Sequence, residues 1–374
     1  MKLFYRRLFF ALILAVIANF SQEIKAQDFR FSQYYAAPLR INPAMAGIID
    51  GSWRVGLNYR SQWGAILNKA YKSFGVMADT RLPVFRDDFV GLSFGAMTDI
   101  SGRGGYNTTD VNLGFSYHKK LSQGSRYTNN SGASYLVAGA QFGFGQRALK
   151  WSNLTYSTQW VGETGTYDPS LYSGENPNVR SSRIYVDASA GMMWYGTFGR
   201  RRSAYAGIAT YHLNRPDISL FNRPAKDSLG NPIGSAVERL YMRWVLQAGG
   251  EILIGGRNSA LSLLPGWVTM FQGPSTEVST GLGICYKAPK YDAFALRFSI
   301  WNRLSNNLTG NMSSDALIFI VGLDYSNLQL RISYDANVSA LRAISNGRGA
   351  MEFSLIYTNP SDTKHQRGCP SFNF

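Results

Sequence analysis

From Ser52 onward, hydrophobic and polar side chains alternate with a period of two over a succession of short segments. In the segment 52–61, one face carries large apolar side chains and the other carries polar, charged or glycine residues: Trp53, Val55, Leu57 and Tyr59 against Arg54, Gly56, Asn58 and Arg60. A β-strand places successive side chains on opposite faces, and a helix does not. The pattern therefore predicts a strand with one apolar face.

The same alternation recurs along the rest of the chain. It is clear at 111–118, 136–145, 183–194, 242–252, 294–303, 328–335 and 351–357, and weaker at 71–80, 89–99, 203–212, 260–270, 277–286 and 315–325. These segments amount to about fourteen strands of roughly ten residues, which is the length that a tilted strand needs to cross a bilayer.

The connections distinguish a membrane barrel from a soluble β-sandwich. If the first strand runs outward, both very long connections, 145–181 and 213–237, fall on the outer side, together with 62–70, 100–108, 271–276, 304–314 and 338–349. The inner connections are mostly short (198–202, 255–258, 287–292 and 326–327), and 119–133 is the exception. Long outer loops above short periplasmic turns are typical of a transmembrane antiparallel up-and-down β-barrel, which we expect over 51–358.

The N-terminus has the layout of a secretory signal. Basic Lys2, Arg6 and Arg7 precede the apolar run 8–20 and a polar stretch that ends at Ala26. The apolar run is short for a spanning helix, so a cleaved signal over 1–26 is favoured over a retained anchor. We expect export to the outer membrane.

The net charge and the cysteine content narrow the possible partners and exclude a disulfide-based fold. The net charge is +15, which in an exported chain points to anionic lipid or acidic polysaccharide before nucleic acid. The two cysteines, Cys285 and Cys369, form no disulfide framework, and whether they pair is left open.

No motif for catalysis or metal binding is present. The three histidines, His118, His212 and His365, have no metal-ligand spacing, and a P-loop pattern is absent. The GxSxG match at 91–95 falls inside the predicted strand 89–99, not on the strand-to-helix turn that a nucleophile elbow needs. No cofactor is implied, and we expect no enzyme. The inward face carries charges of both signs, Arg54, Arg60, Arg183, Arg243, Arg297 and Arg331 beside Asp79, Asp99, Asp187, Glu251 and Asp324. These could line a pore or form ion pairs within the wall.

Six short motifs, in order along the chain, resemble those of the PorP/SprF family of the Bacteroidota type IX secretion system. They are Phe31-Ser32-Gln33-Tyr34 with Asn42-Pro43-Ala44-Met45-Ala46-Gly47; Tyr59-Arg60-Ser61-Gln62-Trp63; Tyr211-His212-Leu213-Asn214-Arg215-Pro216; Tyr334-Asp335-Ala336-Asn337-Val338-Ser339; Gly349-Ala350-Met351-Glu352-Phe353-Ser354-Leu355; and Cys369-Pro370-Ser371-Phe372. The resemblance implies an outer-membrane barrel that exports or attaches surface proteins, including adhesins in gliding members. Its implied partners are periplasmic peptidoglycan-linked or lipoprotein components and the secreted cargo. It supplies no catalytic residue.

The segments outside the strands are the candidate contact surfaces. Residues 27–50 are too polar and turn-rich to span a membrane, and we expect either a periplasmic-side plug that folds into or under the lumen or an ordered lead-in to the first strand. The two long loops, with Trp151, Tyr156, Trp160, Tyr167 and Tyr172, suit either cargo contact or a self-packed lid. The tail 359–374 is expected in the periplasm. A general or nutrient-selective porin is the alternative function, and an enzyme comes third.

Overall fold

The computed structural model describes residues 28–360, apart from 65, 68, 86, 103, 124–131, 151–152, 174–181, 200, 221–224, 227–231, 234–237, 257–258, 288–293 and 307–310. None of the helices in this part of the chain is long and apolar enough to cross a membrane.

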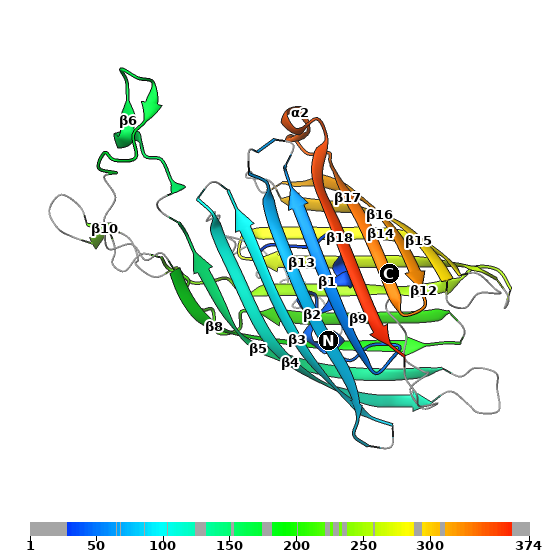
Figure 1. The fold of residues 1–374 in the computed structure, drawn as a ribbon. Coiled ribbons are helices and arrows are strands. Elements are labelled where there is room, and N and C mark those ends of the chain that lie inside the picture. Colours follow the sequence, from blue (N-terminus) through cyan, green and yellow to red (C-terminus); the bar gives the residue numbers. More distant parts are fainter. Residues whose placement is uncertain are drawn as a thin grey trace, which may run out of the picture.

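The described residues form a closed antiparallel barrel of 14 strands (Figure 1). The strands are β1 (Trp53–Gln62), β2 (Tyr71–Pro83), β3 (Phe89–Ser101), β4 (Tyr106–Gln123), β5 (Ala133–Ala148), β8 (Ser182–Thr197), β9 (Arg202–Tyr211), β12 (Arg243–Leu253), β13 (Leu261–Gln272), β14 (Ser275–Lys287), β15 (Phe294–Asn306), β16 (Met312–Tyr325), β17 (Leu328–Asn337) and β18 (Arg348–Asn359). Each strand pairs with its neighbour along the chain, and β1 pairs with β18 to close the ring. Closure leaves no unpaired strand edge that lipid would fail to solvate.

The predicted barrel and its strand number are confirmed, and the differences lie at strand ends. β4 runs to Gln123, well into the predicted connection 119–133, and β5 begins at the last residue of that connection, Ala133. The predicted loop 271–276 is wrong, because only Gly273 and Pro274 separate β13 from β14. Gly273 has φ +56°, a backbone conformation that permits so tight a turn.

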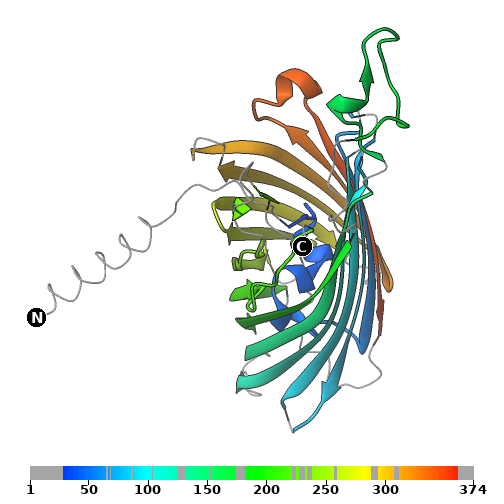
Figure 2. The same cartoon turned by 90° about the vertical axis from the view of Figure 1, so that its left-hand side faces the viewer.

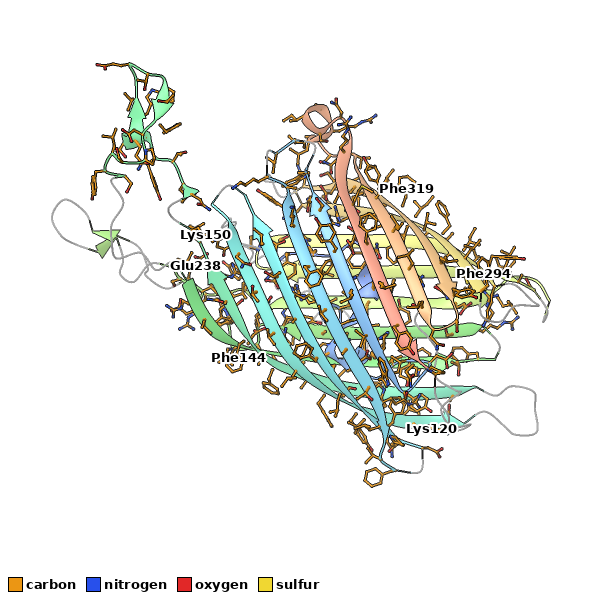
Figure 3. The ribbon with its side chains drawn as sticks, viewed as in Figure 1. Lys120, Phe144, Lys150, Glu238, Phe294 and Phe319 are labelled. Atoms are coloured by element: carbon orange, nitrogen blue, oxygen red, sulfur yellow. The ribbon has the colours of Figure 1, made fainter. Side chains whose placement is uncertain are left out.

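The two ends of the barrel differ. We call the end with the connections β5–β8 and β9–β12 the long-loop end, and the other end, with turns such as Ser326-Asn327, the short-turn end. In Figure 3, Lys150 and Glu238 mark the long-loop end and Lys120 marks the short-turn end. The connection β5–β8 carries a small hairpin of β6 (Trp160–Val161) and β7 (Thr166–Tyr167), the connection β9–β12 carries β10 (Ala225–Lys226) and β11 (Pro232–Ile233), and β17–β18 carries α2 (Arg342–Ser345).

The outer wall is apolar. The phenylalanines Phe144, Phe294 and Phe319 lie on the outer surface (Figure 3), and the exposed strand side chains are mostly large and hydrophobic. A surface of this kind is stable only against lipid.

The inner wall holds its charges in ion pairs. Arg54 binds Asp79 through two hydrogen bonds of 2.9 Å, Asp324 lies between Arg297 (2.8 Å) and Arg331 (2.6 Å), and Arg201 pairs with Glu251 at 2.9 Å. These ion pairs fit the second of the two expectations, in which paired charges hold the wall in shape, whereas Asp99 accepts hydrogen bonds from Ser73 and Ser101.

Candidate functional site

The segment 28–50, which we call the lumen segment, lies inside the barrel. Figures 1 and 2 show it in blue on the inner side of the strands. All residues from Phe31 to Ile49 are buried except Arg40, which is half-buried. The segment starts near the long-loop end, where Asp28 contacts Arg243 and His212, and leaves at the short-turn end, where Ser52 bonds to Asn359. The segment therefore lies within the lumen over most of its length.

Three short 3-10 turns give the segment its compact shape: η1 (Tyr34–Ala36), η2 (Pro38–Arg40) and η3 (Pro43–Met45). Pro38 and Pro43 each occupy the first position of a turn. A backbone N–H at that position would have no partner within the turn, so the missing N–H of proline costs nothing, and the fixed φ of proline suits the helix. The Asn42 side chain caps η3 by accepting a hydrogen bond of 2.9 Å from Ala44 N. The sequence Asn-Pro-Ala thus builds a rigid turn without a regular helix.

Glycines in the wall make room for this turn. A Cβ on Gly139 would lie 2.6 Å from Ala44 N, a Cβ on Gly191 would lie 2.0 Å from Asn42 Oδ1, and a Cβ on Gly91 would lie 2.2 Å from the Ala46 carbonyl oxygen. The backbone of the segment thus lies directly against the backbone of β3 and β5, and the side chains of Asn42 and Pro43 lie against β8. The Asn42 amide also donates to the carbonyls of Met192 and Ile208.

A charged network holds the start of the segment. Glu352 on β18 accepts hydrogen bonds from the backbone N–H groups of Ser32 (2.7 Å) and Gln33 (3.1 Å), and an ion pair of 3.2 Å joins it to Arg60. The Ser32 hydroxyl donates to Asp335 at 2.6 Å. Asp335 also accepts from Arg60 and Arg303, at 2.9 and 3.1 Å. Two carboxylates and two guanidinium groups balance one another, which lets these buried charges persist.

A second network surrounds Asp28. Its carboxylate lies 2.7 Å from His212 Nε2 and 2.9 Å from Arg243, and its backbone N–H donates to Gln272 at 3.1 Å. His212 Nδ1 lies 2.9 Å from Asp187. Burial raises the pKa of Asp28, but His212 and Arg243 outweigh it and hold the pKa well below its usual range. Burial lowers the pKa of His212, but the two carboxylates raise it to about 9. At neutral pH His212 is therefore a cation between two anions.

A third contact lies toward the short-turn end. The Gly47 N–H donates to Asp79 at 2.9 Å, and the Ala46 carbonyl accepts from Ser116 and lies 2.8 Å from His118 Nε2. Gly47 has φ +74° and its backbone touches Gly91, so a side chain there would be strained. Between this contact and the other two, Tyr34 and Tyr35 pack against Trp301, each with ring centroids 5.8 Å apart.

A cavity of about 260 Å³ lies over the segment toward the long-loop end. Its lining mixes charges of both signs, among them Asp28, Arg60, Asp99, Arg147 and Asp315. Within the described ranges, no group of three or more His, Cys, Asp or Glu side chains is placed to hold a metal ion.

Comparison with known proteins identifies the family. The family model described as type IX secretion system membrane protein PorP/SprF matches residues 23–357. The chain belongs to the PorP/SprF family. This is a family of secretion-system membrane components, not of enzymes, and together with the barrel it supports a location in the membrane.

Comparison with solved structures finds membrane proteins of low similarity. The structure of OprB from Pseudomonas putida is similar at 11% identity and TM-score 0.35, covering 82% of this chain and 93% of that one. The CymD monoaromatic hydrocarbon channel is similar at 11% identity and TM-score 0.42, covering 87% and 92%. CdiB from Acinetobacter baumannii is similar at 7% identity and TM-score 0.39, covering 82% and 60%. No curated protein matches.

The structure brings many of the PorP/SprF motif residues to the lumen segment. Phe31, Ser32, Gln33, Asn42, Pro43 and Gly47 lie within it, and Arg60, His212, Asp335 and Glu352 contact it. Phe31 packs against Ala37 and Met97. The motifs of the first strand and of the last two strands thus meet at the N-terminal motif.

The remaining motif residues shape the rim of the barrel. β9 pairs with β8 only from Ala190 onward. Before that point, the Asn214 side chain bonds to the backbone of β8: it donates to the Val186 carbonyl at 2.7 Å and accepts from Ala188 N at 3.3 Å. The carbonyl of Pro216 accepts from Leu240 N at 2.9 Å. Trp63 packs against Tyr71 with tilted rings, and the Asn337 side-chain amide donates a hydrogen bond to the Ser345 hydroxyl. Cys369 and Pro370 lie outside the described residues, and Cys285 is buried beside Leu264 and Ala295.

Sequence reasoning did not select several residues of the site. Asp28, Arg303, Glu277 and the wall glycines Gly139 and Gly191 all contact the lumen segment. A charged or glycine residue on the inward face of a strand is a weak signal, because many such positions occur in any barrel with a polar interior.

Proposed function

We propose that this PorP/SprF protein is a non-enzymatic outer-membrane component of the type IX secretion system that supports export or surface attachment of secreted proteins such as adhesins. In members that glide, loss of such attachment would impair gliding. The protein would bind and hold its partners, with no reaction of its own.

The observation that carries this proposal is the occupied lumen. The lumen segment is bonded to the wall through Glu352, His212 and Asp79, at both ends of its course. A porin needs an open aqueous path. A segment buried over almost its whole length blocks that path, so it favours a docking component over the porin alternative. The family motifs listed above would then serve to fix this plug.

The proposed orientation follows from the lengths of the connections at the two ends of the barrel. With the signal removed after Ala26 and the long-loop end outside, the short-turn end and the tail 359–374 would face the periplasm. Peptidoglycan-linked or lipoprotein components would dock at that side. This arrangement agrees with the usual placement of long loops and short turns in outer-membrane barrels.

The hairpin of β6 and β7 is the candidate surface for secreted cargo. Trp160, Tyr167 and Tyr172 are exposed on it or beside it, and Trp160 packs against Tyr167 with ring centroids 5.0 Å apart. Figure 1 shows this hairpin standing away from the barrel. Exposed rigid aromatics are frequent anchors of protein interfaces.

Deletion of the gene, followed by proteomics of the cell surface and secreted fraction, tests the function. Loss of one surface protein indicates a dedicated adaptor, and loss of all cargo indicates a core component. An unchanged surface proteome contradicts the proposal. Purification from outer membranes gives a second measurement, because a porin should come out alone or as a homo-oligomer, whereas a secretion component should bring periplasmic lipoproteins and cargo.

Conductance tests the plug. Liposomes that contain the protein should conduct poorly, and deletion of 28–47 should raise the conductance. Unchanged conductance after deletion would count against a plug. The full-length variant Glu352→Gln, which keeps the chain intact, guards against a deletion that only prevents folding.

A further inference from the structure

β1 connects the two boundaries of the apolar wall. Its first residue, Trp53, packs against Tyr357 at the short-turn end, with ring centroids 5.3 Å apart, and its last residue, Gln62, lies at the long-loop end. Strands rise about 3.3 Å per residue and tilt by roughly 40°, so the ten residues of β1 span about 25 Å along the membrane normal. This equals the height of the apolar band between the aromatic girdles of outer-membrane barrels.

Basic side chains gather at the upper of these two boundaries. Lys72 is exposed on β2 directly after Tyr71, and Arg348 is exposed at the start of β18. The strands β18, β1 and β2 are consecutive in the barrel, and Ser61 of β1 pairs with both Lys72 and Met351. Lys69 and Arg342 are exposed in the adjoining connections. We call these four residues the basic rim.

The basic rim lacks local acidic partners. None of its four side chains forms an ion pair with another residue in the part of the chain that the structure describes. The acidic residues of β2 and β18, Asp79 and Glu352, are buried and face the lumen. At the short-turn end the arrangement is different, because Lys119 pairs with Asp88 at 2.8 Å and Lys120 with Asp87 at 2.9 Å.

Aliphatic side chains accompany the basic rim. Ile66 and Leu67 are exposed beside Lys69, and Leu341 and Ile344 are exposed on either side of Arg342, Ile344 to 69%. Charged heads with apolar neighbours suit the boundary between acyl chains and headgroups, where long basic side chains reach toward the polar layer. The surface thus offers excess positive charge at the depth of lipid phosphates.

We propose that the basic rim binds the phosphate groups of a glycolipid in the outer leaflet of the outer membrane. The proposal rests on the orientation given above, with the long-loop end outside. At that depth the anionic groups available around the whole barrel are those of the lipid headgroups. Multiple unpaired cations on one face, next to aliphatic side chains, match a ligand that carries several phosphates on a sugar and several acyl chains.

Lipid binding by the purified full-length protein tests the proposal. The probe is bis-phosphorylated lipid A in phosphatidylcholine nanodiscs, with bound lipid counted by native mass spectrometry. The test variant combines Lys72→Gln with Arg348→Gln. The control combines Lys119→Gln with Arg202→Gln, which removes two exposed basic residues at the short-turn end. Each basic residue near an anionic surface contributes about fivefold in affinity, so the rim variant should bind roughly 30-fold more weakly. The control should bind within about twofold of the wild type, since neither change touches the rim.

Three results would overturn the proposal. The first is equal loss of binding in the rim and control variants, and the second is equal binding of lipid A and its dephosphorylated form by the wild type. The third is normal lipid A binding by the rim variant together with loss of a co-purifying protein, which would make the rim a protein contact. None of these measurements uses cargo or secretion, so the outcome is independent of whether the proposed secretion function holds.

Discussion

The carboxylate of Asp28 lies 2.7 Å from Nε2 of His212, 184 positions further along the chain. Asp28 belongs to the lumen segment, and His212 follows β9 in a left-handed backbone conformation with φ +59°. A residue other than glycine rarely adopts this conformation without a compensating contact. The ion pair, with Asp187 on the other ring nitrogen, supplies such a contact and ties the start of the segment to the rim.

We expect this tie to depend on pH. The pKa of His212 is raised from 6.5 to about 9, so its contribution to stability is complete below about pH 6.5 and is lost as the pH rises through 9. The pKa of Asp28 is lowered, so its contribution is complete above about pH 4 and is lost as the pH falls further. Arg243, Arg40, Arg147, Asp187 and Asp110 also act on the pair.

The measurement is thermal unfolding of the wild type and His212→Gln at pH 6 and pH 10. The wild type should be the more stable at pH 6, and the difference should shrink at pH 10. A difference that stays constant would show that His212 acts without its charge. Asp28→Asn should be the more damaging variant at pH 6, since leaving a buried cation without its partner costs about 3–5 kcal/mol.

Glu352 should control how firmly the segment is held. Glu352→Gln keeps the shape of the side chain but removes its charge, which weakens its bonds to Ser32, Gln33 and Arg60. Loss of charge-assisted bonds of this kind costs about 1–3 kcal/mol. We expect faster proteolysis of the segment and raised conductance. Glu251→Gln is the matched control, because Glu251 pairs with Arg201 in the wall. Equal effects in both variants would assign the change to the wall.

The wall glycines should tolerate substitution only where the segment is absent. A Cβ on Gly139 would lie 2.6 Å from Ala44 N, whereas a Cβ on Gly95 would meet nothing within 4 Å. Overpacking typically costs about 1–3 kcal/mol. Gly139→Ala should therefore lower the unfolding temperature, and Gly95→Ala should leave it unchanged. Similar unfolding temperatures for the two variants would mean that the segment moves aside at little cost.

The sequence predicts the wall far better than the site. Alternation at 52–61 places β1 within one residue of its observed bounds, Trp53–Gln62, because lipid on one side and a polar interior on the other impose a strict period of two. The prediction fails where β4 continues through Lys119 and Lys120 to Gln123. This end of the strand no longer faces only apolar lipid. Polar residues are therefore tolerated on both faces, and the alternation that would reveal the strand is lost.

The contacts of the lumen segment do not follow from the pattern. Ser32 and Glu352 are separated by 320 positions and meet only because β1 pairs with β18 and the segment folds back inside the ring. Alternation predicts that Glu352 faces inward. It does not predict how far along the barrel axis Glu352 lies from Ser32, since that distance depends on the stagger between strands. The family motifs indicate which residues matter, but the structure is needed to show that they meet.

The exposed aromatics of the β6–β7 hairpin give the last prediction. Trp160 and Tyr172, the latter exposed to 76%, make no contribution to the barrel wall. If they contact cargo, Trp160→Ala with Tyr172→Ala should cut the amount of surface-attached cargo at least tenfold, because an aromatic anchor contributes about 2 kcal/mol or more to an interface. Barrel stability should not change. Phe85→Ala is the control, since Phe85 is an aromatic residue exposed at the short-turn end. Quantitative surface proteomics of the three strains decides the matter: cargo that stays at wild-type levels in the double variant would favour a self-packed lid over a docking surface.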